Sequence, residues 1–175
     1  PDGITVSETT HGGLGLFATR DFTKGSVVYT GEFYDIISAR DCEVILDTNL
    51  GNFSTTLEGH AVKREDDKGG WRVYSFDALI NHSCKANCTD MNLQYNHKTV
   101  DNNDIMDGKN NVQQMTGTYQ KIATRDITSG DELTTDYDMF ICAYGGIPHC
   151  YCGEDCCRGS SYGFFYLPHT TQISL

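Results

Sequence analysis

The chain has 175 residues, and 13 Lys and Arg against 24 Asp and Glu give it a formal net charge of −11. This length fits one domain with a small appendage. The acidic balance argues against nucleic-acid binding through a basic face and favours a basic protein or peptide partner, with simple solubility as the alternative. No apolar run approaches the ~20 residues of a membrane span, so we expect no membrane partner. We also expect an intracellular protein and a monomer.

Short runs of β-branched and aromatic residues, separated by turn residues, dominate the sequence. Residues 26–30, 71–76 and 117–123 are examples, and such runs predict strands. Residues 36–46 best fit a helix, because Ser38 offers a cap and the apolar positions form a partial face. The sequence therefore predicts a mostly β fold with few short helices.

Two segments of the chain repeat one pattern. Residues 17–25 and 122–130 each contain Ala-Thr-Arg-Asp and end in Gly. In each copy the Asp can accept hydrogen bonds from turn amides, and the Gly can adopt positive φ. Because two copies are too few for a solenoid, they predict two similar hairpins in one β domain.

Composition changes at two further places. Residues 95–118 are rich in Asn and Asp, which predicts a mobile inserted loop, with a lid or partner site as the alternative. From Ile141 the chain becomes rich in Gly and Cys. These shifts predict a main domain over residues 1–140 and a small metal-held segment over residues 141–167.

The cysteines cluster in a way that favours a metal over a disulfide framework. Cys150, Cys152 and Cys157 lie close enough in sequence to grip one tetrahedral Zn²⁺, and Cys84 is the best candidate for the fourth ligand. Cys156 could replace Cys157, and disulfides or free thiols are the alternative. A segment this short buries too little apolar area to order itself, so the metal would supply its folding energy.

Three more patterns accompany the cysteines. They are Gly13-Leu14-Gly15, the Asn-His-Ser-Cys run over residues 81–84, and the Glu-Leu-Thr-Thr-Asp-Tyr run over residues 132–137. Each alone is weak, because Gly-x-Gly turns are common and single His or Asp residues are usually structural. Together with the cysteine cluster, and in this order along the chain, these patterns resemble those of SET-domain lysine methyltransferases with a post-SET zinc segment. The resemblance spans residues 4–167 and lacks the family's Cys-rich pre-SET cluster, so it is to the small stand-alone type.

The resemblance implies a fold, a cofactor and a set of site residues. The fold would be short twisted β-sheets around a pseudoknot, with the zinc-held segment at the C-terminal end. The cofactor would be S-adenosylmethionine (AdoMet), and Tyr137 would be the catalytic tyrosine that orients the lysine amine. The cofactor-binding residues would be Gly13, Leu14, Gly15, Asn81, His82 and Tyr137, and the Zn²⁺ ligands would be Cys84, Cys150, Cys152 and Cys157.

Some positions depart from the family pattern. Thr135 stands where family members commonly have Phe or Tyr. The smaller side chain implies a roomier substrate pocket that accepts more methyl groups, with a different substrate or weakened catalysis as the alternatives. Ala78 and Leu79 replace a common Arg-Phe pair. The second active-site tyrosine of the family has no evident counterpart: Phe53 falls in its region, and the other candidates are Tyr29, Tyr34 and Tyr74.

The resemblance implies an AdoMet-dependent methyltransferase that acts on the ε-amino group of a protein lysine, with a histone tail as one candidate substrate. The alternatives are a catalytically weak or inactive SET module that binds a peptide or partner, and a SET fold repurposed for a small-molecule substrate. Action on histones would place the protein in the nucleus, and another substrate would place it in the cytoplasm.

Overall fold

The computed structural model describes residues 2–36, 43–48, 51–56, 61–63, 71–74, 76–95, 113–139 and 146–174. These residues are mostly strand, which confirms the predicted fold class. The strands are β1 (Ile4–Glu8), β2 (Leu14–Ala18), β3 (Val27–Ile36), β4 (Glu43–Thr48), β5 (Gly51–Thr56), β6 (Ala61–Lys63), β7 (Trp71–Tyr74), β8 (Asn81–His82), β9 (Cys88–Tyr95), β10 (Gln113–Ala123) and β11 (Glu132–Thr135). The helical elements are the 3₁₀ turns η1 (Asp77–Leu79), η3 (Tyr137–Met139) and η4 (Phe164–Tyr166), and the short helix α2 (His169–Ser174).

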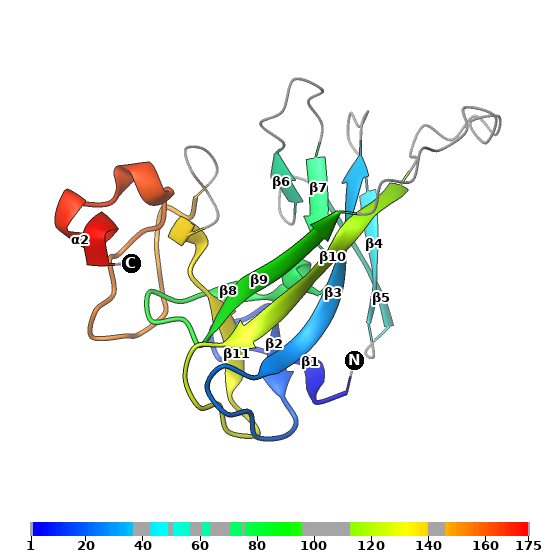
Figure 1. The fold of residues 1–175 in the computed structure, drawn as a ribbon, viewed down its shortest axis with the longest axis horizontal. Coiled ribbons are helices and arrows are strands. Elements are labelled where there is room, and N and C mark those ends of the chain that lie inside the picture. Colours follow the sequence, from blue (N-terminus) through cyan, green and yellow to red (C-terminus); the bar gives the residue numbers. More distant parts are fainter. Residues whose placement is uncertain are drawn as a thin grey trace.

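The strands form three sheets. One has the order β6-β7-β3-β10-β9, a second has the order β1-β2-β11-β8, and β4 and β5 form a two-stranded ribbon. Figure 1 shows β9, β10 and β3 as long twisted neighbours, with the red and orange C-terminal segment beside one end of the fold. In the second sheet, β11 pairs antiparallel with β2 and parallel with β8, so strands from three distant parts of the chain meet there.

The hydrophobic core draws on both larger sheets. Leu16 of β2 and Leu133 of β11 lie opposite each other in register, and both are fully buried. Phe33 of β3 and Tyr119 of β10 are equally buried, and all four belong to one cluster of packed side chains. Burial of side chains of this size contributes about 1.5–3 kcal/mol each, so this shared core fixes the two sheets relative to each other.

A fully buried lysine lies within the five-stranded sheet. The Lys121 ammonium forms ion pairs with Asp77, at 2.6 Å, and with Asp90. The hydroxyls of Tyr29 and Tyr119 both donate to the Asp77 carboxylate. Burial by itself would lower the pKa of Lys121, but the two carboxylates outweigh it and raise that pKa, so the side chain stays charged.

The two repeated segments pair with each other. Phe22 and Ile127 exchange both backbone hydrogen bonds, at 2.9 and 2.8 Å. Gly25 and Gly130 have φ of +83° and +96°, as the predicted turns require. The prediction of two similar hairpins in one β domain did not include this pairing, which joins the segment after β2 to the segment after β10.

The aspartates of the repeat also act across this pairing. Asp21 accepts a hydrogen bond from the backbone N–H of Ser129, and Asp126 accepts one from the N–H of Lys24, both at 2.8 Å. The prediction that these aspartates bond turn amides is correct, but each amide belongs to the other copy. The Phe22–Ile127 bridge causes the exchange, because it places each carboxylate opposite the partner turn.

Two local predictions need correction. The helix expected over residues 36–46 is wrong, since Ile36 ends β3 and residues 43–46 lie in β4; residues 37–42 lie outside the described part. A short apolar run such as residues 44–46 fits a strand as well as a helix. The loop expected over residues 95–118 is too long, because residues 113–118 belong to β10; residues 96–112 lie outside the described part.

The described residues contain no helix that is both long and apolar enough to span a membrane.

Candidate functional site

The Gly-x-Gly, Asn-His-Ser-Cys and Glu-Leu-Thr patterns meet around one side chain. The Asn81 amide nitrogen donates to the Leu14 carbonyl at 3.1 Å and to the Glu132 carboxylate at 2.7 Å. Both amide hydrogens therefore have partners within the protein, and the Asn81 Oδ1 atom remains as an acceptor. We call Leu14, Asn81 and Glu132 the three-strand node, because they come from β2, β8 and β11.

Glycine at position 15 allows this node to close. A Cβ atom there would lie 2.7 Å from the Glu132 carboxylate and 2.9 Å from the Asn81 amide nitrogen. Gly13 serves a different need, since its φ of +83° is one that other residues rarely adopt. The close approach that the structure shows at Gly15 is therefore to Asn81 and Glu132.

Asn87 ties the turn between β8 and β9 to β11. Its amide nitrogen donates to the Glu132 carbonyl at 2.8 Å, and its Oδ1 atom accepts from the Thr134 N–H at 2.8 Å. The side chain is buried, so these bonds are screened little by water. Sequence reasoning named neither Asn87 nor Glu132 as a site residue, although Glu132 begins the Glu-Leu-Thr-Thr-Asp-Tyr run and Asn87 lies three residues after the Asn-His-Ser-Cys run.

Tyr137 begins η3, directly after the buried Asp136. Its hydroxyl donates to the Ile80 carbonyl at 2.7 Å. Burial, with smaller contributions from the charges of Asp77 and Glu132, raises the pKa of Tyr137 to about 12. The phenol is therefore neutral at physiological pH, and its oxygen lone pairs remain available to a group that approaches it.

His82 connects this tyrosine to the cysteines. Its Nδ1 atom accepts a hydrogen bond from the Tyr137 N–H at 3.1 Å, which assigns the ring proton to Nε2. The Nε2 atom lies 3.4 Å from the Cys84 sulfur. Burial lowers the pKa of His82 despite the nearby Asp136, so the imidazole is neutral and bridges two parts of the site.

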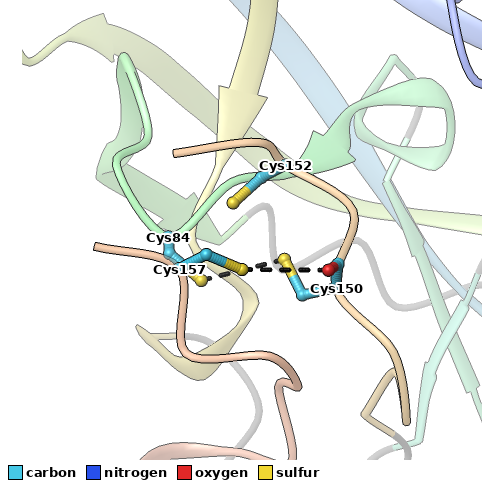
Figure 2. A group of neighbouring side chains, drawn as sticks. All are labelled: Cys84, Cys150, Cys152 and Cys157. Carbon is cyan, nitrogen blue, oxygen red and sulfur yellow. Dashed lines mark hydrogen bonds between the residues drawn. The ribbon is translucent and has the colours of Figure 1, made fainter. Parts of the chain in front are cut away.

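Four of the predicted metal ligands converge. The sulfur atoms of Cys84, Cys150, Cys152 and Cys157 lie within 4.8 Å of one another, and Figure 2 shows them pointing into a shared space. The Cys84 and Cys150 sulfurs are 3.8 Å apart, which is about the separation that a tetrahedral Zn²⁺ with 2.3 Å bonds requires. Cys156 is exposed and outside the group. The four sulfur atoms therefore fit a Zn²⁺ site. Of the two cysteines that the sequence offered as the ligand near residue 157, Cys157 belongs to the group and Cys156 does not.

The thiols respond differently to their surroundings. Burial raises the pKa of Cys84 to about 11 and raises that of Cys150 further. Burial also acts on Cys152, but hydrogen bonds from the backbone at Cys84 and Glu154 and from two neighbouring thiols outweigh it and lower its pKa to about 7. Metal binding would therefore have to displace protons from this cluster.

A cavity of about 490 Å³ opens beside the three-strand node, within the size range of small-molecule sites. Asn81, His82, Glu132 and Tyr137 line it, and so do five residues of the C-terminal segment (residues 146–174). The lining residues are Thr9, Thr10, His11, Gly12, Asn81, His82, Ser83, Asn87, Arg125, Glu132, Thr134, Tyr137, Ile147, His149, Tyr151, Cys152 and Glu154. Three of the six predicted cofactor-binding residues, Asn81, His82 and Tyr137, thus line one concave space of a size that can hold a cofactor. The Gly13-Leu14-Gly15 turn is not among the lining residues, and it adjoins the space only through the three-strand node.

The remaining site candidates lie elsewhere. Thr135 is buried, with a hydroxyl that has no hydrogen-bond partner among the described residues, and Thr134 rather than Thr135 lines the cavity. Tyr29 belongs to the buried Lys121 network. Tyr34, Tyr74 and Phe53 lie in β3, β7 and β5. The pocket role of Thr135 and the identity of a second active-site tyrosine stay predictions.

Comparison with known proteins supports the resemblance. The chain is similar to "Histone-lysine N-methyltransferase ASHH2" of Arabidopsis thaliana, with 29% identity over 151 residues; the match covers 84% of this chain and 7% of that protein. It is also similar in fold to a crystal structure described as a candidate histone methyltransferase of Plasmodium falciparum, with a TM-score of 0.50 and 15% identity over 77% of this chain and 96% of that one. A family model for the SET domain matches residues 13–138, and the chain therefore belongs to the SET-domain family.

Proposed function

We propose that the protein is an AdoMet-dependent protein-lysine N-methyltransferase, with a basic peptide such as a histone tail as its substrate. The observation that carries the proposal is that Asn81 and Glu132 of the three-strand node line one cavity of about 490 Å³ together with Tyr137, in a SET-domain chain. The name of the Arabidopsis relative supports the choice of lysine, although this chain spans only 7% of that relative.

The cavity suits a cationic cofactor. The Asn81 amide nitrogen donates to Leu14 and Glu132, which leaves the Asn81 Oδ1 atom as an acceptor for a ligand. Glu132 adds a carboxylate to the residues that line the cavity. AdoMet carries an ammonium and a sulfonium, and when bound it would supply a methyl group already activated for displacement. The residues of the chain would then have to bind it, exclude water and align the incoming amine.

Tyr137 would align that amine. Because its hydroxyl proton is committed to the Ile80 carbonyl, its oxygen can accept a hydrogen bond from the lysine nitrogen. The phenol is a poor base with a pKa raised to about 12, so its role would be orientation. A lysine has an ordinary pKa near 10.4, and desolvation beside a cationic cofactor would lower it toward the neutral amine that reacts.

The thiol cluster would hold a structural Zn²⁺ that orders the C-terminal wall of the cavity, since Cys152 belongs to both. The net charge of −11 favours a basic substrate through long-range attraction. A histone substrate would place the activity in the nucleus.

Replacement of Gly15 by Ala should weaken cofactor binding. The added Cβ would press on the Glu132 carboxylate and the Asn81 amide, and both groups line the cavity. We expect AdoMet affinity to fall by about tenfold, equivalent to about 1.4 kcal/mol. Titration calorimetry of wild type and Gly15→Ala measures this. Gly25→Ala is a control for general destabilisation, because its φ of +83° strains an alanine but an added Cβ there would meet no atom within 4 Å. Equal affinities of Gly15→Ala and wild type would contradict the proposed cofactor site.

Replacement of Tyr137 by Phe should slow methyl transfer without comparable loss of cofactor binding. The variant keeps the ring and loses only the hydroxyl that would orient the amine, so we expect kcat to fall about 100-fold. Calorimetry with AdoMet and single-turnover transfer to a histone mixture separate the two effects. Unchanged turnover in Tyr137→Phe would exclude the assigned role.

Replacement of Thr135 by Phe should reduce the number of methyl groups that each lysine accepts. The family pattern implies that this position borders the substrate lysine, and a phenylalanine there would leave less room than the buried threonine for added methyl groups. We expect wild type to produce di- or trimethyllysine and Thr135→Phe to stop earlier, while Thr135→Ser, with a similar volume, keeps the wild-type pattern. Mass spectrometry of the peptide products measures this, and an identical product pattern for all three proteins would refute the pocket assignment.

A further inference from the structure

Two buried carboxylates flank Tyr137. Asp138 is fully buried and Asp136 is 8% exposed. The N–H of Asp138 donates to the Asp136 carboxylate at 3.1 Å, so the two residues form one short acidic turn around the tyrosine. Buried carboxylates destabilise a fold unless cations or hydrogen-bond donors meet them.

The donors that meet them come from the C-terminal segment. The Nη2 atom of Arg158 lies 2.5 Å from Asp136 and 2.8 Å from Asp138, and its Nε atom donates to Asp138 at 3.1 Å. The second oxygen of Asp138 accepts hydrogen bonds from the Ser161 hydroxyl at 2.8 Å and the Gly163 N–H at 2.7 Å. A forked guanidinium thus bridges the residues before and after Tyr137.

Arg158 is also tied to the thiol cluster. It directly follows Cys157, its N–H donates to the Cys84 sulfur at 3.3 Å, and its Nη1 atom lies 3.5 Å from the Cys84 carbonyl. The guanidinium can therefore reach both aspartates only while the chain around Cys157 lies against Cys84. Opening of the cluster would withdraw Arg158 and leave the acidic turn unpaired.

We propose that Arg158 is a positioning residue that makes the placement of Tyr137 depend on a closed thiol cluster. The chain then has a built-in order of assembly, in which the C-terminal segment must dock before the tyrosine is held in place. His82 forms a second link between Cys84 and the Tyr137 backbone, but it holds one N–H, whereas Arg158 holds the side chains on both sides. The consequence for turnover rests on the proposed function; the consequence for the position of Tyr137 does not.

Fluorine NMR of protein labelled with 3-fluorotyrosine tests the placement without any need for activity. The Tyr137 signal is assigned as the one missing from Tyr137→Phe. In wild type, this signal should shift when a chelator removes Zn²⁺. In zinc-loaded Arg158→Gln it should lie at the metal-free position, although the metal content stays at one ion per chain. Ser161→Ala is the matched control, because it removes a bond to Asp138 from the same segment and should leave the signal unchanged.

Three results would overturn the proposal. The first is a zinc-loaded Arg158→Gln whose Tyr137 signal coincides with that of wild type. The second is an equal shift in Ser161→Ala, which would show that any loosening of the segment has this effect. If Arg158→Gln fails to retain Zn²⁺, Arg158→Lys takes its place in the test. A lysine ammonium cannot fork between both aspartates, so the Tyr137 signal of Arg158→Lys should lie between the wild-type and metal-free positions. A Tyr137 signal in Arg158→Lys that coincides with that of wild type is the third contrary result.

Turnover provides a separate readout. In Arg158→Gln we expect kcat to fall about 10- to 100-fold, since a displacement of about 1 Å at a catalytic group has effects of this size, while the KM for the peptide stays within about threefold. If wild type transfers no methyl group at all, the proposed function fails and the NMR result still decides the role of Arg158.

Discussion

Replacement of Lys121 by Met should destabilise the protein by about 3–5 kcal/mol at neutral pH, the range measured when one partner of a buried ion pair is removed. Lys121 is fully buried, and its ammonium faces Asp77 and Asp90. Methionine fills much of the same volume but leaves two carboxylates close together without a cation. Urea unfolding of both proteins measures the difference.

The pH dependence distinguishes a charge effect from a packing effect. Burial, and then the charge of Asp77, raises the pKa of Asp90 to about 6 from an ordinary value near 3.8. Because the folded state holds this proton more tightly, the contribution of Asp90 to stability is complete below about pH 4 and is lost as the pH rises through about 6. Lys121 acts to lower the pKa of Asp90, so without it this carboxylate holds its proton more strongly. The deficit of Lys121→Met should therefore shrink toward about pH 5.

Asp90→Asn is the matched control for this network. It leaves the Lys121 ammonium opposite one carboxylate, that of Asp77, so we expect the free energy of unfolding to change by less than about 1 kcal/mol. We also expect that the stability of Asp90→Asn no longer falls between about pH 4 and 6. A Lys121→Met deficit that is the same at about pH 5 and at neutral pH would show that only packing had been lost.

Replacement of Cys152 by Ser should disorder the C-terminal segment and leave the sheets folded. Metal binding of structural zinc sites contributes about 10–16 kcal/mol in small peptides, far more than the apolar contacts of a segment of this size. This segment exposes Tyr151, Phe165, Tyr166 and Ile173, so its own packing is slight. Hydrogen exchange should show lost protection over residues 146–174 and unchanged protection in β2, β10 and β11.

Cys156→Ser is the control, because Cys156 lies next to a ligand in the sequence but outside the converging sulfurs. It should keep one Zn²⁺ per chain and the wild-type exchange pattern. Chelation of the metal from wild type should reproduce the Cys152→Ser pattern. Full protection of the segment in Cys152→Ser would contradict a folding role for the metal.

Much of the site could be predicted from the sequence, because its parts are carried by short motifs. Asn81, His82, Cys84 and Tyr137 were recognised by their neighbours in the chain, and the structure places them around one cavity and one thiol cluster. The mostly β fold followed from short apolar runs that turn residues separate. These features depend on local sequence, which a reader of the chain sees directly.

Other features depend on contacts between distant residues, which the sequence does not display. From its neighbours in the chain, Lys121 would be predicted to be an exposed lysine in a strand. In the folded protein it pairs with Asp90 of β9 and Asp77 of η1. Arg158 is 20 positions from Asp138 in the chain, and nothing nearby marks them as partners. Asp21 and Asp126 each accept a hydrogen bond from the other copy of the repeat, and these bonds likewise depend on the Phe22–Ile127 bridge.

The most direct test of the proposed function is the intact mass of core histones after incubation with zinc-loaded protein and AdoMet. We predict methyl-sized mass additions on a histone, located on lysine by fragmentation, that require AdoMet and fall about 100-fold in rate in Tyr137→Phe. If AdoMet binds but neither histones nor a panel of other basic proteins gain mass, the protein is not the lysine methyltransferase proposed here, and a binding module or a small-molecule enzyme takes its place.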